Sequence, residues 1–378
     1  MKPDAEELLQ QDNRTIMRSI IQRIATGPHM SKDITTEEAR AGMRAILEGD
    51  IDEVQAALFL IALRMKRETD AENIGVLDGI RDVCITATAE VDDVLDMSDP
   101  YNGYNRSLPA APFLPAVMAA CGVPTVSHGV ENMGPKFGIT HHRVLRAAGI
   151  KVDDSVEQAA SRLSSASGWA YVDQKAYCPP LHDLTSLRSK MVKRQAITTV
   201  EVLTRPIRGR QRTHYMSGYV HKPYTEIYAR LARHSGFDSC LMVRGVEGGI
   251  IPSLRQQGKV FRYVDMGEET AQDFDPADIS IHHEVRATPL PEDLPAAEVG
   301  DDVGADFDVL AASQLAAEAG IEALQGKTGT PTADALVYAG AIALWHLGKA
   351  DGLQQGAETI RKVLENGSAL ERFNANSD

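Results

Sequence analysis

Two loops in the stretch Ser98–Gly149 determine how this chain is expected to fold. The first, SDPYNGYNRS at Ser98–Ser107, follows an extended apolar run and precedes a helix. The second, HGVENMGPKFG at His128–Gly138, follows the short strand Pro124–Ser127 and precedes a helix that ends at Gly149. Small and polar residues between a parallel strand and a helix are where open α/β sheets bind anions. We therefore predict an anion site at this edge of a parallel sheet.

Length and composition indicate an ordinary globular protein of more than one lobe. The chain has 378 residues, of which 43% are hydrophobic and 24% charged. The longest apolar run, Ala56–Leu63, is far shorter than the ~20 residues of a membrane span, and no secretory signal is visible. The cysteines lie far apart without a CxxC pair, which argues against a zinc ribbon and favours a reducing compartment. We therefore expect a cytoplasmic protein.

The charge of the chain is strongly negative but uneven. A net charge of −14 disfavours a dedicated nucleic-acid binder, because such binding relies on basic side chains that neutralise phosphates. Between Arg188 and Arg212, however, eight basic residues accompany one acid, Glu201. This basic stretch is either a solvated helix face with a loop or a surface for an anionic ligand.

Two patterns divide the chain into a helical part and an alternating part. In the first ninety residues, Thr35–Glu38 fits a capping box, and the all-apolar centre of a helix at Glu53–Arg67 is typical of a buried helix in a bundle. After Val91, short apolar strands alternate with helices, which predicts a mainly parallel sheet with helices on both faces. The strands are predicted at Val91–Met97, Pro124–Ser127, Trp169–Asp173, Ser239–Arg244 and Lys259–Val264.

Proline and glycine mark the ends of the later elements. Pro223 begins a helix that stops before Gly236, and Thr330-Pro331 begins a helix that runs to Leu347. The segment Ala287–Asp308 has no periodicity and is predicted to be a solvated loop. Asn366-Gly367 is predicted to end the last helix of the chain.

Several motifs, taken in order, resemble glycosyltransferase family 3, and in particular anthranilate phosphoribosyltransferase. Thr125–Gly129 resembles the family's strand before its H-G turn, and Gly218-Tyr219 with the following helix resembles its G-V-Y segment. Val243–Gly248 resembles the V-H-G-x-x-G strand end, and Ala335–Ala350 resembles the closing N-A-A-x-x-L-x-x-x-G-K-A run. The similarity covers nearly the whole chain.

The resemblance implies an α/β fold of the nucleoside phosphorylase/phosphoribosyltransferase type. It places a small N-terminal helical domain at 1–90, joined by about 178–198, and a large α/β domain with a mainly parallel central sheet at 91–378. The ligand cleft then lies between the two domains. Family members pair through their helical domains, so a homodimer is expected.

The chain departs from the family at the residues that bind phosphate and metal. The glycine-rich G-T-G-G-D loop is replaced by DPYNGYNR at Asp99–Arg106, in which a proline removes one N–H donor. Ser127 stands where the family's K-H-G-N motif has its lysine, and Ile250-Ile251 replaces an Asp-Glu pair that holds metal. Mg²⁺ stays a candidate cofactor, although Glu247 alone is a poor site for it. Ordinary metal-assisted stabilisation of a leaving pyrophosphate is therefore not expected.

A subset of the family lacks those motifs and keeps the fold, and this chain resembles that subset more closely. The shared features are Tyr101–Gly103, Tyr177–Leu181, His128-Gly129 and Glu247-Gly248. Nucleic-acid binding has been assigned to at least one branch of these paralogues.

The resemblance and the loop positions together give a set of candidate site residues. Arg188 is a candidate for binding an acceptor carboxylate, because a guanidinium pairs with a carboxylate through two hydrogen bonds, and Arg194 could point at the same cleft. A structural salt bridge is the alternative for Arg188. Glu247 is a weak candidate for a metal ligand. The candidates for binding substrate or phosphate are Asn102, Gly103, Asn105, Arg106, Ser107, His128, Gly129 and Lys136.

Two functions are consistent with these features. The first is an anthranilate phosphoribosyltransferase-like enzyme, which moves a pentosyl group from a phosphorylated donor to a small aromatic or amine acceptor through an altered phosphate site. The second is a non-catalytic paralogue that binds nucleic acid or another polyanion through the basic stretch 188–212. The missing Asp-Glu pair favours the second function, and the net charge of −14 favours the first.

Overall fold

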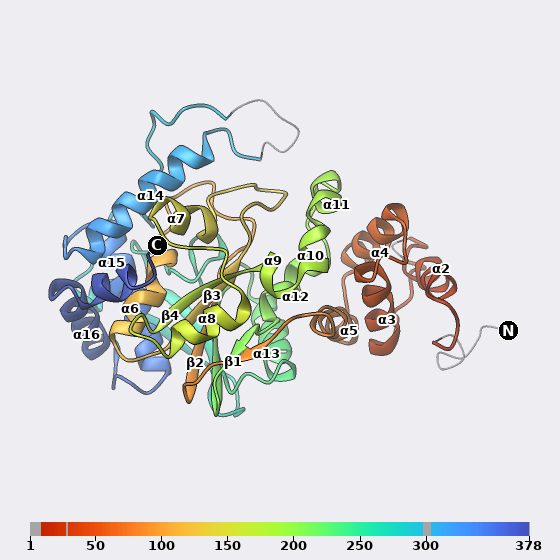
Figure 1. The fold of residues 1–378 in the computed structure, drawn as a ribbon, viewed down its shortest axis with the longest axis horizontal. Helices are drawn as coiled ribbons and strands as arrows, with labels where there is room; N and C mark the ends of the chain where they lie inside the picture. The colour runs from red at the N-terminus through yellow and green to blue at the C-terminus, as the bar shows by residue number, and fades with distance from the viewer. Residues whose placement is uncertain (1–8, 28, 298–303, 378) are drawn as a thin grey trace.

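The N-terminal part of the protein is a helical bundle. The computed structural model describes residues 9–27, 29–297 and 304–377. The bundle helices are α2 (Asn13–Ile24), α3 (Thr36–Leu47), α4 (Glu53–Lys66) and α5 (Asp70–Arg81). The predicted capping box is confirmed: the Thr35 hydroxyl accepts a hydrogen bond from the Glu38 N–H, and the Glu38 carboxylate accepts one from the Thr35 N–H. In Figure 1 the bundle lies at one end of the molecule.

A seven-stranded sheet with the order β4-β3-β2-β6-β7-β8-β9 forms the centre of the larger part. The first five strands in this order are parallel, and β8 and β9 are antiparallel additions at one edge. A separate parallel pair joins β1 and β5. The strands are β1 (Ala87–Thr88), β2 (Asp93–Ser98), β3 (Thr125–Gly129), β4 (Trp169–Asp173), β5 (Ile207–Arg208), β6 (Arg212–Gly218), β7 (Ser239–Val243), β8 (Gly258–Tyr263) and β9 (Thr270–Phe274).

Helices cover both faces of this sheet, and successive side chains of β2 point into two different cores. Leu95 and Met97 pack with the C-terminal helices, whereas Val94 belongs to the core that also contains the helical bundle. Figure 1 shows α15 and α16 at the end of the molecule opposite the bundle. The helices are α6 (Leu114–Ala120), α7 (His141–Ala147), α8 (Val156–Leu163), α9 (Gln174–Tyr177), α10 (Pro179–Asp183), α11 (Thr185–Lys190), α12 (Ile197–Val200), α13 (Pro223–His234), α14 (Val309–Leu324), α15 (Pro331–His346), α16 (Leu353–Glu365) and α17 (Ser368–Asn374), with 3-10 turns at Ala111–Phe113, Glu201–Leu203, Val246–Gly248 and Pro276–Ile279.

The fold class predicted from the sequence is confirmed, with corrections at particular elements. All five predicted strands exist, and α13 and α15 begin at Pro223 and Pro331. A helix, α16, does end at Asn366-Gly367 as predicted, but it is not the last one, because Gly367 adopts a left-handed conformation (φ +78°) that turns the chain into α17. In addition, α14, β6, β9 and the short strands β1 and β5 were not predicted. No helix in the described residues is long and apolar enough to cross a membrane.

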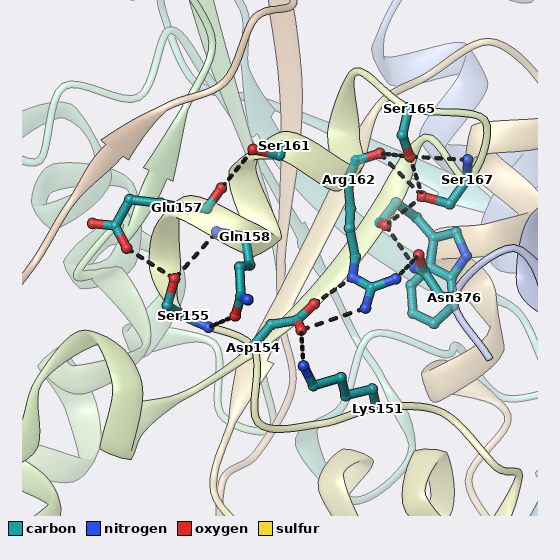
Figure 2. A network of polar contacts seen from close by, with 11 residues as sticks. Lys151, Asp154, Ser155, Glu157, Gln158, Ser161, Arg162, Ser165, Ser167 and Asn376 are labelled. Carbon is teal, nitrogen blue, oxygen red and sulfur yellow. Dashed lines mark hydrogen bonds and ion pairs between the residues drawn. The ribbon is translucent and has the colours of Figure 1, made fainter. Parts of the chain in front are cut away.

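The C-terminus is tied to α8 by a buried polar network. The Arg162 guanidinium pairs with the carboxylate of Asp154 and donates a hydrogen bond of 2.9 Å to Asn376 Oδ1. Asn376 Nδ2 in turn donates to the carbonyl oxygen of Trp169, the first residue of β4, at 2.8 Å. Figure 2 shows Arg162 between Asp154 and Asn376, with Lys151 on the far side of the Asp154 carboxylate. The chain end is therefore anchored to the edge strand of the sheet.

Candidate active site

A cleft of about 240 Å³ lies between the helical bundle and the carboxyl ends of the parallel strands. Its lining includes Arg64 of α4 on one side, and the residues that follow β2, β6 and β7 on the other. The helix α11 contacts α4 of the bundle. Both lobes therefore contribute to one site. Its polar and aromatic lining includes Asp99, Tyr101, Asn102, Arg188, Arg194, Glu201, Ser217, Tyr219, His221, Tyr224, Tyr228 and Glu247.

Asp99 fixes the loop that follows β2. One of its carboxylate oxygens accepts a hydrogen bond of 2.6 Å from the Tyr104 hydroxyl and lies 3.0 Å from His141 Nε2. The other accepts the N–H of Ile250 at 2.9 Å. Burial raises the pKa of the Tyr104 phenol well above its usual value, so this hydroxyl keeps its proton and serves as a donor. Both oxygens of Asp99 are thus engaged, and they join the loop after β2 to His141 of α7 and to Ile250 in the loop after β7.

Gly103 allows the two loops of the opening stretch to meet. Its φ is +73°, and a Cβ at this position would lie 2.6 Å from the carbonyl carbon of Gly138. Backbone hydrogen bonds of about 3 Å join Tyr104 to Ile139 in both directions, and the Gly138 N–H donates to the Asn102 carbonyl. The Asn102-Gly103 turn is therefore buried against the second loop, and Asn102 lines the cleft.

Four hydrogen-bond donors from the two loops converge on the carboxylate of Glu247. The N–H groups of Asn105 and Arg106 donate at 3.0 and 2.9 Å, and the Ser107 hydroxyl donates at 3.0 Å. Lys136 Nζ lies 3.4 Å from the same carboxylate. We call these four donors the anion cradle. Burial lowers the pKa of the Lys136 ammonium, although the charge of Glu247 opposes this shift.

These residues do not fit a Mg²⁺ ion held by the protein. The oxygens of Glu247 already accept four hydrogen bonds, and Asp99 is engaged with Tyr104, His141 and Ile250. Among the residues that the structure describes, no group of three or more His, Cys, Asp and Glu side chains is arranged to hold a metal. Since Mg²⁺ prefers octahedral oxygen ligands, any ion here would depend on oxygens that a ligand brings.

His128 and Gly129 belong to β3, and His128 lies in a buried network. Its Nε2 is 2.9 Å from an Asp96 carboxylate oxygen, and its Nδ1 forms a short hydrogen bond with the Tyr101 hydroxyl. The Tyr101 and Tyr177 hydroxyls are 2.7 Å apart, and burial raises the pKa of both phenols well above the usual value. Of this network only Tyr101 lines the cleft, and among the described residues no hydrogen bond joins His128 to the anion cradle.

Arg188 and Arg194, the two predicted acceptor residues, have different surroundings. The buried Arg188 guanidinium donates two hydrogen bonds of 2.7 Å to the Glu201 carboxylate, which is the structural salt bridge that the sequence left open. Arg194 is exposed at the rim of the cleft. In the described part of the chain, no hydrogen bond or ion pair engages its guanidinium. Of these two arginines, Arg194 is therefore the one whose charge is available to a ligand.

Three of the six other cations of the basic stretch are also paired with acids. Lys190 lies 3.1 Å from Glu53, Arg210 lies 3.2 Å from Asp92, and Arg212 lies 3.0 Å from Asp93. These acids come from segments far away in the sequence, so inspection of 188–212 alone overestimates the positive charge of this surface.

Sequence reasoning missed the helical wall of the cleft. The first ninety residues gave no candidate, yet Arg64 lines the cleft, with its guanidinium carbon 5.8 Å from the centre of the Tyr224 ring. Tyr219 and Tyr228 add aromatic surface to the same space. A usable signal existed, because Arg64 is the only charged residue in the otherwise apolar run 56–65.

With the bundle, the sheet and the interlobe cleft in place, the chain can be compared with known proteins. Residues 18–84 match the family described as the glycosyl transferase family, helical bundle domain. The helical part thus matches the helical bundle domain of a glycosyl transferase family, and the whole chain has a fold of the anthranilate phosphoribosyltransferase type. In sequence, the chain is similar to anthranilate phosphoribosyltransferases.

Individual relatives agree with this placement. Anthranilate phosphoribosyltransferase of Methanopyrus kandleri is 27% identical over 364 residues, which cover 93% of this chain and 97% of that protein. An uncharacterised protein of Aquifex aeolicus is 30% identical over 221 residues, and the match spans only 65% of its length and 58% of this chain.

Solved structures share the fold at low sequence identity. Anthranilate phosphoribosyltransferase from Saccharomyces cerevisiae, in complex with PRPP and Mg, superposes with a TM-score of 0.72 at 12% identity and covers 97% of this chain and 98% of that one. The enzyme from Thermus thermophilus gives a TM-score of 0.69 at 18% identity, with 96% and 98% covered.

Proposed function

We propose that the protein is a phosphoribosyltransferase-type enzyme, which transfers a pentosyl group from a phosphorylated donor to a small aromatic or amine acceptor. The observation that carries this proposal is the interlobe cleft, where the carboxyl ends of β2, β6 and β7 face α4 and α11. Several relatives that match nearly the whole chain are anthranilate phosphoribosyltransferases, and one solved relative binds PRPP and Mg.

Different residues in the lining of the cleft suit the phosphorylated donor and the aromatic acceptor. Cleavage of the bond to C1 of a ribosyl donor leaves negative charge on the departing phosphates, which nearby cations and N–H donors stabilise. Arg194, Asn102 and the anion cradle are the groups that we assign to this task. Tyr219, Tyr224 and Tyr228 offer ring surface for an aromatic acceptor. Glu201 already occupies Arg188, so we assign no carboxylate of the acceptor to that guanidinium.

Calorimetry with phosphoribosyl pyrophosphate in the presence of Mg²⁺ tests the donor half of the proposal. We expect saturable binding, which anthranilate or a related aromatic amine converts into release of pyrophosphate. Absence of heat at millimolar ligand would refute the proposal. A mobility shift with single-stranded DNA over a salt series tests the polyanion alternative, for which pairing with acids removes four of the eight cations of 188–212.

A homodimer formed through the helical part is proposed along with this function. An apolar groove of about 420 Å³ on α4 and α11 is lined by Val54, Leu58 and Met191 among others, and Val54 and Leu58 are 69% and 41% exposed. Apolar surface of this kind is typical of an interface. Sedimentation should give a dimer for the native chain and a monomer for Leu58→Glu, and a native monomer at micromolar concentration would contradict the proposal.

A further inference from the structure

The anion cradle is built for an anion, and the protein fills it with its own side chain. All four converging groups are donors: two backbone N–H groups, the Ser107 hydroxyl and the Lys136 ammonium. A set composed only of donors, one of them positively charged, is the arrangement that binds phosphate in loop sites. The side chain of Glu247 is only 8% exposed within it.

We infer that the Glu247 carboxylate holds a phosphate-class site in the ligand-free protein, and that a phosphate group of the ligand enters this site by displacing it. This inference rests on the proposed function, because that function supplies the phosphorylated ligand. The cradle itself does not depend on which phosphorylated molecule is bound. Orthophosphate, pyrophosphate and a phosphorylated sugar present the same tetrahedral oxygens to the four donors.

The backbone around Glu247 favours displacement. Its φ of +53° lies in the left-handed region, which a residue with a Cβ rarely adopts without compensating contacts. The contacts that compensate here are those of the cradle. Gly245, Gly248 and Gly249 surround this residue and can absorb a change in backbone angles, since glycine is permissive. Glu247 also borders the cleft, so its side chain has space to move into.

Electrostatics makes the two occupants mutually exclusive. A phosphate oxygen and the Glu247 carboxylate would both need the N–H groups of Asn105 and Arg106. Two negative charges held by the same donors would also be close enough to repel each other strongly. Lys136, the one cation among the donors, cannot neutralise both. The native protein is therefore expected to bind small phosphates weakly, and removal of the carboxylate is expected to strengthen binding.

Calorimetry with inorganic pyrophosphate tests this inference on the full-length chain. We expect Glu247→Ala to bind pyrophosphate at least about tenfold more tightly than the native protein, and Glu247→Gln to show a smaller gain in the same direction. Ser107→Ala in the Glu247→Ala background should reverse the gain, because it removes one donor of the cradle. Glu322→Ala, which breaks an exposed pair with Lys327, serves as the matched control and should leave binding unchanged.

The same titrations separate this inference from the proposed function. If Glu247→Ala gains affinity for pyrophosphate but no variant binds phosphoribosyl pyrophosphate, the displaced carboxylate stands and the proposed function fails. If native protein and Glu247→Ala bind phosphoribosyl pyrophosphate equally and pyrophosphate no better, the function stands and the inference is overturned. If Glu247→Ala fails to fold, the isosteric Glu247→Gln decides, and unchanged affinity in a folded Gln variant overturns the inference.

Discussion

Single residues explain why two anion sites of this cleft are already filled. Glu201 pairs with Arg188, and Glu247 pairs with the anion cradle. A guanidinium as deeply buried as that of Arg188 needs a partner, because an unpaired buried charge is costly. The chain's own carboxylates therefore neutralise the positive groups at both places.

The Arg188–Glu201 pair leads to a prediction about stability. Glu201→Ala leaves a buried guanidinium without a partner, and such losses cost about 3–5 kcal/mol of the free energy of unfolding. Urea unfolding measures this difference. The control is Glu53→Ala, whose pair with Lys190 is exposed on both sides and should contribute less than about 1 kcal/mol. Equal effects of the two substitutions would contradict the assigned burial of the pair.

Arg194 leads to a prediction about binding instead. Because its guanidinium is exposed and unpaired in the described structure, Arg194→Ala should leave the free energy of unfolding within about 0.5 kcal/mol of the native value. Affinity for phosphoribosyl pyrophosphate should fall about tenfold or more, as expected when a charged hydrogen bond is lost. Lys193→Ala is the matched control, because Lys193 is exposed but does not line the cleft. Similar losses in both variants would indicate a general charge effect.

For single residues, the sequence predicts where a residue lies in the fold better than which other residues it contacts. The location of Asn102, Asn105 and Lys136 near a ligand edge follows from strand–loop–helix order, since the carboxyl ends of parallel strands share one edge. That Glu247 fills the cradle does not follow, because it lies 142 residues from Asn105 in the chain and reaches it only through the sheet order.

Elements were predicted where local signals were strong. Capping residues and prolines located α3, α13 and α15, because these signals act within one turn of the helix. The strand β6 was missed because its sequence, RTHYMSG, mixes polar and apolar residues even though most of its side chains are buried. Tertiary pairing with β2 and β7 gives this segment its conformation.

The link between α8 and the C-terminus leads to a prediction at the same scale. Arg162→Ala removes the main partner of the buried Asp154 carboxylate and the contact with Asn376 (Figure 2). We expect a loss of about 3 kcal/mol in the free energy of unfolding. This loss is smaller than for a carboxylate left with no partner, because Lys151 stays 3.3 Å from Asp154. Thermal and urea unfolding measure it. Lys259→Ala, which breaks an exposed pair with Asp273, should change stability little, and a comparable loss there would argue against the network.

The whole molecule is organised around a sheet with a hydrophobic core on each face. One buried histidine, His346, makes the stability of this arrangement depend on pH. His346 ends α15, and its Nε2 lies 2.9 Å from Ser239 Oγ at the start of β7. Ser239 Oγ lies 2.8 Å from His214 Nδ1 of β6. Burial, and then the charges of Arg262 and His214, lower the pKa of His346 to about 3 from an ordinary value of 6.5. The imidazole is therefore neutral in the folded protein.

This shift predicts how stability depends on pH. Between the two pKa values of His346, about 3 folded and 6.5 unfolded, the unfolded chain binds a proton that the folded chain excludes. The contribution of His346 is thus complete above the unfolded value and is lost as pH falls towards the folded one. The free energy of unfolding lost through this shift is about 2 kcal/mol between about pH 8 and about pH 5.

The variant His346→Gln can keep a hydrogen bond to Ser239 but cannot titrate. In urea unfolding over the same pH interval, its loss of stability should be smaller than that of the native protein by this amount. His214, whose pKa burial also lowers, should keep part of the dependence in the variant. Identical pH dependence in the two proteins would show that His346 accepts a proton in the folded state, and that the packing of α15 against the sheet is looser than described.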